Sequence, residues 1–188
     1  MDPHLAGIPL ELGLVREAGV VAGVSGRKLR PGQKGGEEVG LTKVGKGTKR
    51  MLVVDGNGIP LALVISRASR AEVRLAQETL DRVRVPGKRG RPRKRPERLV
   101  ADKAYDSDEF RLWLRRKGVI PCIPPRENRK GRRKKWEEEY KERWRVERTF
   151  AWVENFRRLV VRYERMAKMY EAFCIVALIL ICLRELLK

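Results

Sequence analysis

The chain has 188 residues, enough for one domain with a buried core, and carries a formal net charge of +20. A balance this basic predicts a polyanionic partner. One histidine and three cysteines argue against a histidine-based metal site, a Ser-His-Asp triad and a cysteine-rich zinc cluster, so we expect any metal to be held by carboxylates. The cysteine usage suits a reducing compartment and no signal peptide is recognisable, so we expect a cytoplasmic protein.

The N-terminal part carries little pattern. Residues 1–19 are expected to be a remnant, with Met1 resembling an internal start, and residues 20–188 are expected to form the domain. A short strand is predicted at Val20–Val24, followed by a glycine- and lysine-rich loop at 25–47.

The strongest local signal in the first half is a hairpin. Two β-type runs, Thr48–Val54 and Ile59–Ser66, flank Asp-Gly-Asn-Gly at 55–58, which is typical of a tight turn between antiparallel strands. Residues Ala71–Val83 then follow a helical period.

After a basic loop at 86–98, the second half alternates strands and helices. The predicted elements are a buried strand Arg98–Ala104, a helix Ser107–Lys117, a strand Val119–Ile123, a long helix Trp136–Arg158 and a helix Ala167–Leu187. Asp106 or Ser107 caps the first of these helices, and Gly118 ends it. The order predicts an α/β fold with a mixed central sheet flanked by helices.

The last predicted helix is apolar nearly all round. Such a helix packs either on the sheet, which we favour, or against a second copy in a homodimer. Its uninterrupted apolar run, Ala172–Leu183, is shorter than the roughly 20 residues that cross a bilayer, so no membrane association is expected.

Phosphodiester chemistry without histidines would need divalent ions held by oxygen ligands. Asp102 follows Leu99-Val100-Ala101 at the end of a predicted buried strand, and active sites of open α/β sheets lie at such ends. The alternative is an aspartate that caps a helix or a turn.

Glu147 lies on the long predicted helix. At roughly 100° per residue it shares one side of that helix with Tyr140, Arg143 and Glu154, beside an apolar face of Val146, Thr149, Phe150 and Val153. A carboxylate beside a buried apolar face costs free energy, so its presence there indicates a functional role. The alternative is an i, i+4 salt bridge between Arg143 and Glu147 on a wet face.

Two basic runs, 86–98 and 126–135, indicate contact with nucleic-acid phosphates, with a solvated loop as the alternative. Arg89-Gly90-Arg91-Pro92 has the core pattern of an AT-hook, whose arginines enter a narrow minor groove. The candidate DNA-binding residues of the first run are Lys88, Arg89, Arg91, Arg93, Lys94 and Arg95. The tryptophans that could stack on bases, although we expect the core to take at least two, are Trp136, Trp144 and Trp152.

These residues form a recognisable pattern. Tyr140-x2-Arg143-x3-Glu147 resembles the Y-(2)-R-(3)-E-(6)-K signature of insertion-sequence transposases in the DDE superfamily. The stretch 144–165 resembles the C-terminal block of that family, and the stretches 47–63 and 95–107 resemble its two upstream blocks, in the right order. The resemblance covers residues 20–187 and identifies the chain as a catalytic-domain fragment.

The resemblance implies an RNase H-like fold in which Asp102 and Glu147 are catalytic and bind metal, Mg²⁺ or Mn²⁺, with two ions in an intact relative. It implies double-stranded DNA as the partner and a nucleoid-associated location. Arg143 would contact phosphate, and Tyr140 would position DNA or a side chain near Glu147. The implied reaction is hydrolysis of a phosphodiester at the element's end, followed by in-line attack of the freed 3′-hydroxyl on target DNA.

The chain departs from the family pattern at its first aspartate, where the alignment puts Ala22, upstream of the Gly-Gly-Glu of 35–37. Glu154 stands where the signature has lysine, and Glu72 stands where such sequences often carry aspartate. Asp55 is expected to stabilise its own turn rather than replace the missing acid. The N-terminal DNA-recognition region of full-length relatives is absent from this sequence.

Functions of different classes therefore stay open. The first is a DDE transposase that cleaves and joins DNA, impaired in this copy by loss of its first catalytic aspartate. The second is a catalytically dead, transposase-derived DNA-binding protein, which the alanine at position 22 favours. A basic RNA-binding protein is a third alternative.

Overall fold

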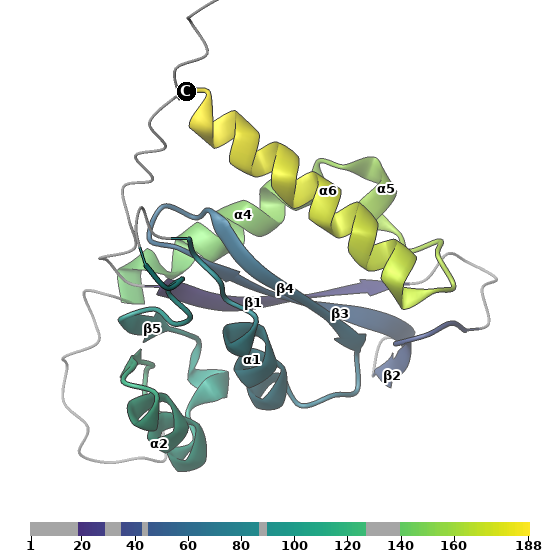
Figure 1. Cartoon of the computed structure of the whole chain (residues 1–188). Coiled ribbons are helices and arrows are strands. Elements are labelled where there is room, and N and C mark those ends of the chain that lie inside the picture. Colours follow the sequence, from purple (N-terminus) through teal and green to yellow (C-terminus); the bar gives the residue numbers. More distant parts are fainter. Residues whose placement is uncertain (1–18, 29–34, 43–44, 87–89, 127–139) are drawn as a thin grey trace, which may run out of the picture.

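The computed structural model describes residues 19–28, 35–42, 45–86, 90–126 and 140–188 (Figure 1). Residues 1–18 of the predicted remnant, Lys88, Arg89 and the second basic run from residue 127 lie outside the described residues, as does Trp136.

A six-stranded mixed sheet forms the centre of the molecule. Its strands are β1 (Gly19–Lys28), β2 (Gly40–Thr42), β3 (Gly45–Val54), β4 (Pro60–Arg67), β5 (Arg98–Val100) and β6 (Ile120–Cys122). Strand β3 pairs antiparallel with β1, β2 and β4. On the other edge of β1 lies β5, parallel to it, and β6 continues the sheet parallel to β5.

Helices cover both faces of this sheet (Figure 1). They are α1 (Glu72–Asp81), the 3₁₀ turn η1 (Lys103–Tyr105), α2 (Asp108–Arg116), the 3₁₀ turn η2 (Lys141–Arg143), α4 (Trp144–Glu154), α5 (Arg157–Val160) and α6 (Ala167–Leu186). Helices α1 and α2 share one apolar cluster with Met51 and Val53 of β3, whereas α4 and α6 share another with Leu52 and Val54. Neighbouring β3 residues thus face opposite layers, as in a strand buried on both sides. The prediction of an α/β fold with a mixed sheet is confirmed.

The predicted hairpin is confirmed as β3 and β4, which pair along nearly their whole length. The predicted first strand is too short, because β1 runs on to Lys28, opposite Gly47, and takes up part of the expected loop. Its glycine- and lysine-rich sequence has no strand pattern, because main-chain pairing to β3 holds this part of the strand in place. The strand after the basic loop ends early, at Val100, since Asp102 is the N-cap of η1.

Helix α2 has the ends that its sequence predicts. Ser107 is the N-cap, because its hydroxyl accepts a main-chain N–H of the first turn at 3.2 Å, and Gly118 follows the helix with φ of 72°. Asp106 is instead buried, and its carboxylate accepts from Nε of Arg111 at 2.7 Å and from the N–H of Arg126 at 2.9 Å. These bonds tie the end of β5 to the end of β6.

The long helix predicted over Trp136–Arg158 is wrong for the residues that the structure describes. Tyr140 leads into η2, and α4 ends at Glu154, before the separate short helix α5. The break lies at Phe156, whose extended backbone (φ −81°, ψ 97°) interrupts the helical hydrogen bonds. Its side chain packs on the apolar cluster of α4 and α6, a tertiary contact that no helical period signals.

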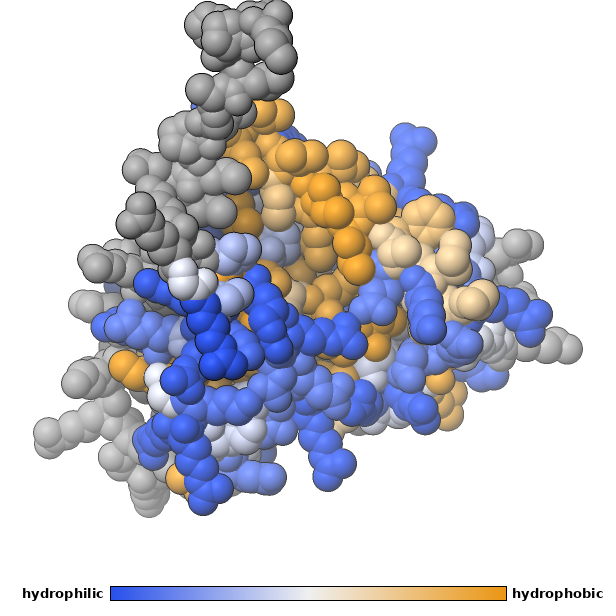
Figure 2. Space-filling model, in the orientation of Figure 1, coloured by the Kyte–Doolittle hydropathy of each residue, from blue (hydrophilic) through white to orange (hydrophobic). Residues whose placement is uncertain are grey.

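Helix α6 confirms the last predicted helix. Only one of its faces is buried, although its sequence is apolar nearly all round. Its buried residues are Tyr170, Cys174, Ala177, Leu178 and Ile181. The opposite face leaves large apolar side chains exposed and accounts for the orange area over α6 in Figure 2. Among the described residues, no helix combines the length and the apolar character that crossing a membrane would need.

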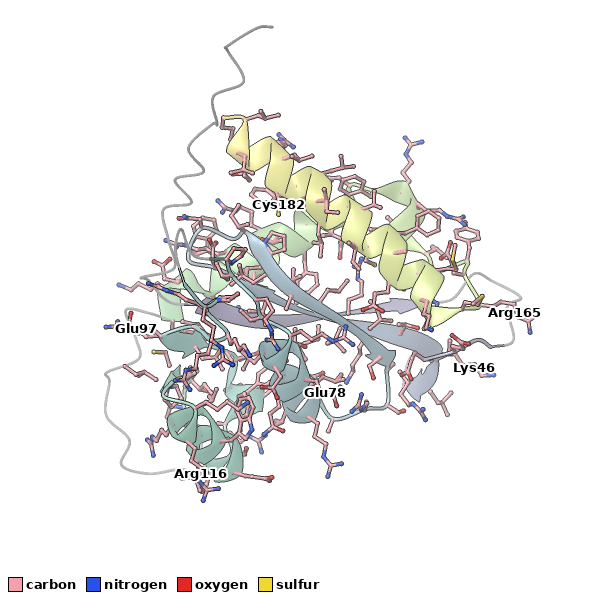
Figure 3. All side chains as sticks on the ribbon, viewed as in Figure 1. Lys46, Glu78, Glu97, Arg116, Arg165 and Cys182 are labelled. Carbon is pink, nitrogen blue, oxygen red and sulfur yellow. The ribbon has the colours of Figure 1, made fainter. Side chains whose placement is uncertain are left out.

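The Gly-Gly-Glu stretch holds the start of α6. The N–H of Glu37 donates to the main-chain oxygen of Arg165 at 2.8 Å, and the Glu37 carboxylate accepts the N–H of Ala167 at 3.0 Å. Arg165 lies at the turn that leads into α6 (Figure 3). Arg162 is fully buried and donates to the main-chain oxygens of Glu37 and Arg165 and to Oγ1 of Thr48. The stretch is therefore a structural joint between α6 and β3.

Candidate active site

Asp102 follows β5 at the carboxyl ends of the parallel strands β5 and β6, near the first residues of β1. It is half-buried, and its Oδ1 accepts the N–H of Lys103 at 2.6 Å, so that it caps η1. The capping role considered for Asp102 is therefore present. It is compatible with a site role, because a carboxylate has several acceptor positions and this edge is where open α/β sheets bind their substrates.

Tyr140 joins Asp102 to the helix that carries Glu147. The Tyr140 hydroxyl donates to Oδ1 of Asp102 over 3.4 Å. Burial raises the pKa of Tyr140; the charge of Arg143 opposes this rise, and the carboxylates of Asp102 and Glu147 add to it. The phenol thus stays protonated near neutral pH and remains a donor to the carboxylate.

Arg143 and Glu147 form an i, i+4 ion pair at 2.7 Å, with side chains 37% and 54% exposed. The salt bridge on a wet face that the sequence left open is therefore present. The Arg143 guanidinium also lies over the Tyr140 ring, 5.7 Å from its centroid. An exposed pair of this kind stabilises a helix by only about 0.5 kcal/mol. Its importance lies in its position, since Asp102, Tyr140, Arg143 and Glu147 make one connected, solvent-facing cluster.

The backbone of β1 reaches the same edge of the sheet. β1 and β5 pair in parallel at Gly19–Leu99 and Val20–Val100, so Ala22 and Asp102 each come two residues after the last pair. The pairing of β1 with β3 is irregular around Ala22. The position that the sequence alignment assigned to the missing aspartate thus lies on the strand next to β5, and its assignment stays a prediction.

Asp55 has the structural role predicted for it. It is buried in the hairpin turn, and its Oδ1 accepts the N–H groups of Asn57 and Ile59, each at 2.8 Å. A carboxylate engaged by its own turn does not replace the missing acid, and the prediction is confirmed.

The two other departures from the family pattern have ionic partners. Glu72 opens α1 and pairs with Lys49 at 3.1 Å. Glu154 lies 3.8 Å from the guanidinium of Arg50, whose side chain is only 1% exposed. A buried guanidinium needs a nearby negative charge. The glutamate in place of the signature's lysine therefore balances a buried arginine of β3.

The hairpin tip supports α4 next to Glu147. Thr149 Oγ1 donates to the main-chain oxygen of Gly58 over 2.7 Å, and Arg148 donates to that of Asn57 at 2.5 Å. Gly58 has φ of 82°, and a Cβ there would lie 2.8 Å from a guanidinium nitrogen of Arg148. Sequence reasoning assigned Thr149 to the apolar face and missed this contact, which joins segments far apart in the chain.

Asp102 and Glu147 are the two carboxylates of this cluster that could bind a divalent ion. Two carboxylates, completed by waters and substrate oxygens, suit the octahedral shell of one Mg²⁺ or Mn²⁺. Within the described part of the chain, no group of three or more His, Cys, Asp or Glu residues could hold a metal ion. The described residues thus offer two carboxylates and no larger ligand group.

The basic loop is closed at its base. Val85 and Arg93 exchange two main-chain hydrogen bonds of 2.9 Å. Arg91, Lys94 and Arg95 are exposed along it. The two described tryptophans of the candidate set differ: Trp152 packs against the core as expected, whereas Trp144 is 49% exposed.

Comparisons with known proteins agree with these features. Residues 26–182 match the family described as "Transposase DDE domain". Over 137 residues the chain is 39% identical to a protein of Burkholderia cepacia whose name describes a transposase for insertion sequence element IS402. The match covers 72% of this chain and 63% of that relative, so the chain spans less than two thirds of the relative's length.

Proposed function

Because this chain belongs to the DDE transposase family, we propose that it is a transposase catalytic domain that cleaves and joins DNA phosphodiesters with divalent metal ions. The observation that carries the proposal is the bond from Tyr140 to Asp102, which links the end of β5 to the Arg143–Glu147 pair. Two carboxylates beside a guanidinium suit a phosphodiester, because the acids attract cations and the guanidinium binds phosphate oxygens. Double-stranded DNA is the partner, and the protein is nucleoid-associated in the cytoplasm.

We assign residues 20–188 to one domain with an RNase H-like fold. The assignment is supported by the mixed sheet, in which the antiparallel strands β4, β3 and β1 continue into the parallel strands β5 and β6. It is also supported by helices on both faces, with α4 lying against β1.

In the proposed reaction, Asp102 and Glu147 would hold the Mg²⁺ or Mn²⁺. Such ions, when bound, activate the attacking oxygen and neutralise charge on the leaving one. Arg143 exchanges its exposed partner Glu147 for phosphate oxygens, which its planar guanidinium binds in a bidentate manner. Tyr140 orients Asp102 by holding one of its carboxylate oxygens.

This copy is impaired in the proposed reaction, because Ala22 stands where a third carboxylate would complete the site. Two-ion chemistry needs a ligand set that holds both ions together. The same alanine favours the alternative function, a catalytically inactive DNA-binding protein derived from a transposase. The two functions share the fold and the DNA partner and differ only in turnover.

Two copies associate through the outer face of α6 in this proposal. The exposed residues spaced alternately four and three apart are Met169, Phe173, Val176, Leu180, Leu183 and Leu187. This spacing is the seam of a left-handed coiled coil, and a seam of this kind is self-complementary. Each partner of a stable dimer buries roughly 800 Å², which an apolar helix of 20 residues can supply.

The proposed reaction is tested by nicking and strand-transfer assays with Mg²⁺ or Mn²⁺ on duplex DNA that carries the element's ends. The proteins compared are this chain, Ala22→Asp, and Ala22→Asp with Glu147→Gln. We expect Ala22→Asp to gain activity that Glu147→Gln abolishes. Ala151→Asp, which adds an acid on the exposed side of α4, is the matched control and should gain nothing.

Each outcome separates the two functions. A folded Ala22→Asp protein that binds duplex DNA and stays inert would contradict the restorable transposase and leave the DNA-binding function. Failure of all the proteins to bind duplex DNA at about 50 mM salt would contradict both.

A further inference from the structure

A basic cavity lies away from the candidate active site. It has a volume of about 540 Å³ and opens between the C-terminal ends of α1 and α2 and the basic loop. We call it the basic cleft; the cations that line it are Arg84, Arg91, Lys94, Arg95 and Lys117. Sequence reasoning noted the loop residues among these but neither Arg84 nor Lys117, because they come from the ends of two separate helices.

The basic cleft and Asp102 lie at opposite ends of strand β5. Pro96 and Val119, which line the cleft, come just before β5 and β6, whereas Asp102 comes after β5. An extended chain rises about 3.3 Å per residue, so the cleft lies on the order of 20 Å from Asp102. That separation corresponds to about six base pairs of duplex DNA.

Charge in the basic cleft is strongly one-sided. Its single acid is Asp81, which already forms an ion pair with Lys117. Within the described part of the chain, Arg91, Lys94 and Arg95 form no ion pair, and all three are exposed. Apolar side chains line the same cavity, including Leu80. Low-dielectric walls focus the field of the cations on whatever enters.

Trp113 decides which part of a nucleic acid the basic cleft suits. Its ring stacks on Phe110, with centroids 5.9 Å apart and planes at 15°, and Lys117 Nζ lies 4.6 Å from its centroid. A ring covered in this way is no free platform for an unpaired base. The cleft therefore favours a phosphate, which Arg91, Lys94 and Arg95 can bind, over an unpaired base.

We propose that the basic cleft binds backbone phosphates of duplex DNA, as a second contact about half a helical turn from the phosphodiester at Asp102. The inference rests on the proposed function for its partner, duplex DNA, but not on catalysis. Contacts of this kind set affinity and orientation without reading sequence. They also leave the DNA bound when the carboxylate cluster is inactive.

The test compares two triple variants of equal charge. Arg91→Gln, Lys94→Gln and Arg95→Gln together remove cations of the basic cleft. Arg74→Gln, Arg157→Gln and Lys168→Gln together remove exposed cations elsewhere. The Kd for a 30-base-pair duplex is measured from 50 to 300 mM salt. The cleft variant should lose about two to three phosphate contacts, lowering the salt slope by about 2 and the affinity at least tenfold. The control should change the slope by less than about 1.

Equal losses in both variants would overturn the inference, since only net charge would then matter. Preferential loss of single-stranded DNA or RNA binding in the cleft variant would also overturn it. Failure of the unaltered chain to bind duplex DNA would remove the proposed function as well. Inertness of Ala22→Asp, by contrast, would remove catalysis and leave the basic cleft intact. All six positions are exposed, so thermal unfolding should stay unchanged and confirm that both variants fold.

Trp113 gives a local readout of the same contact. Duplex binding next to Lys117 should change the emission of Trp113, and Trp113→Phe should remove that change while binding persists. A duplex titration with the same emission change in both proteins would place the DNA elsewhere and contradict the proposal.

Discussion

The hydroxyl of Tyr140 lies 3.4 Å from Oδ1 of Asp102 and joins the end of strand β5 to the helix that carries Glu147. The contact connects residues from two segments that the sequence pattern marks separately. It makes the geometry of the carboxylate pair depend on one phenol.

Removal of that phenol should weaken metal binding. We expect Tyr140→Phe to lower the affinity for Mn²⁺ about tenfold, because a residue that orients a metal-binding carboxylate typically has an effect of this size. Mn²⁺ titration followed by calorimetry measures it. Tyr163→Phe, at an exposed tyrosine that makes no contact with Asp102, is the control. Unchanged affinity in Tyr140→Phe would show that the contact does not orient Asp102.

Gly58 should be required for the support of α4. Gly58→Ala introduces a Cβ 2.8 Å from Arg148 Nη2 at a backbone φ of 82°, so we expect a loss of about 2–3 kcal/mol in urea unfolding. Gly90→Ala isolates the backbone term, because Gly90 has φ of 90° and no atom within 4 Å of the added Cβ. Its cost should stay near about 1 kcal/mol. Equal costs at the two sites would contradict the packing of the hairpin tip on α4.

Loss of the buried Arg162 side chain should strongly destabilise the fold. Arg162→Ala leaves the main-chain oxygens of Glu37 and Arg165 without this buried donor, and we expect about 3 kcal/mol of lost stability. Arg157→Ala, at an exposed arginine of α5, should cost less than about 0.5 kcal/mol. Urea unfolding followed by circular dichroism compares the two variants. A small loss of stability in Arg162→Ala would contradict the structural role of Arg162 between α6 and β3.

Stability should fall in alkaline solution because of Tyr105. Burial raises the pKa of Tyr105, with the carboxylates of Glu72 and Asp102 adding to the effect, whereas the unfolded chain keeps a value near 10. The stabilising contribution is therefore complete below pH 10 and is lost as the pH rises above it, by about 1.4 kcal/mol per pH unit. Between pH 9 and 11.5, the free energy of unfolding of Tyr105→Phe should fall less steeply with pH than that of the unaltered chain. The exposed-site control Tyr163→Phe should fall as steeply as the unaltered chain.

The outer face of α6 should control oligomeric state. We expect the chain to sediment as a dimer at micromolar concentration and Val176→Lys with Leu180→Glu to sediment as a monomer. Both side chains are about half exposed in the monomer, so the two new charges should leave the fold of the monomer intact and disturb only the dimer interface. Leu41→Glu alters another exposed leucine, 71% exposed, and should leave the dimer intact. A monomeric parent chain would rule out this interface.

Much of the fold was predictable because its signals are local. Turn chemistry at 55–58, the helix start at Ser107 and the stop at Gly118 each depend on a few neighbouring residues, and the structure has all of them. The carboxylates Asp102 and Glu147 were nominated in the same way, from a strand end and a helical face with a family signature. Their catalytic role stays a prediction.

Charge balance and surface exposure could not be predicted from local sequence, because they depend on the packed molecule. The pairing of Glu154 with buried Arg50, the break at Phe156 and the half-exposed α6 depend on contacts between segments far apart in the chain. The basic cleft arises for the same reason, from the ends of two helices and a loop. Local sequence predicts most of the elements and suggests the candidate acids, because hydrogen bonding and periodicity act over short distances. Burial and charge compensation depend on the whole packed molecule, and only the folded chain specifies them.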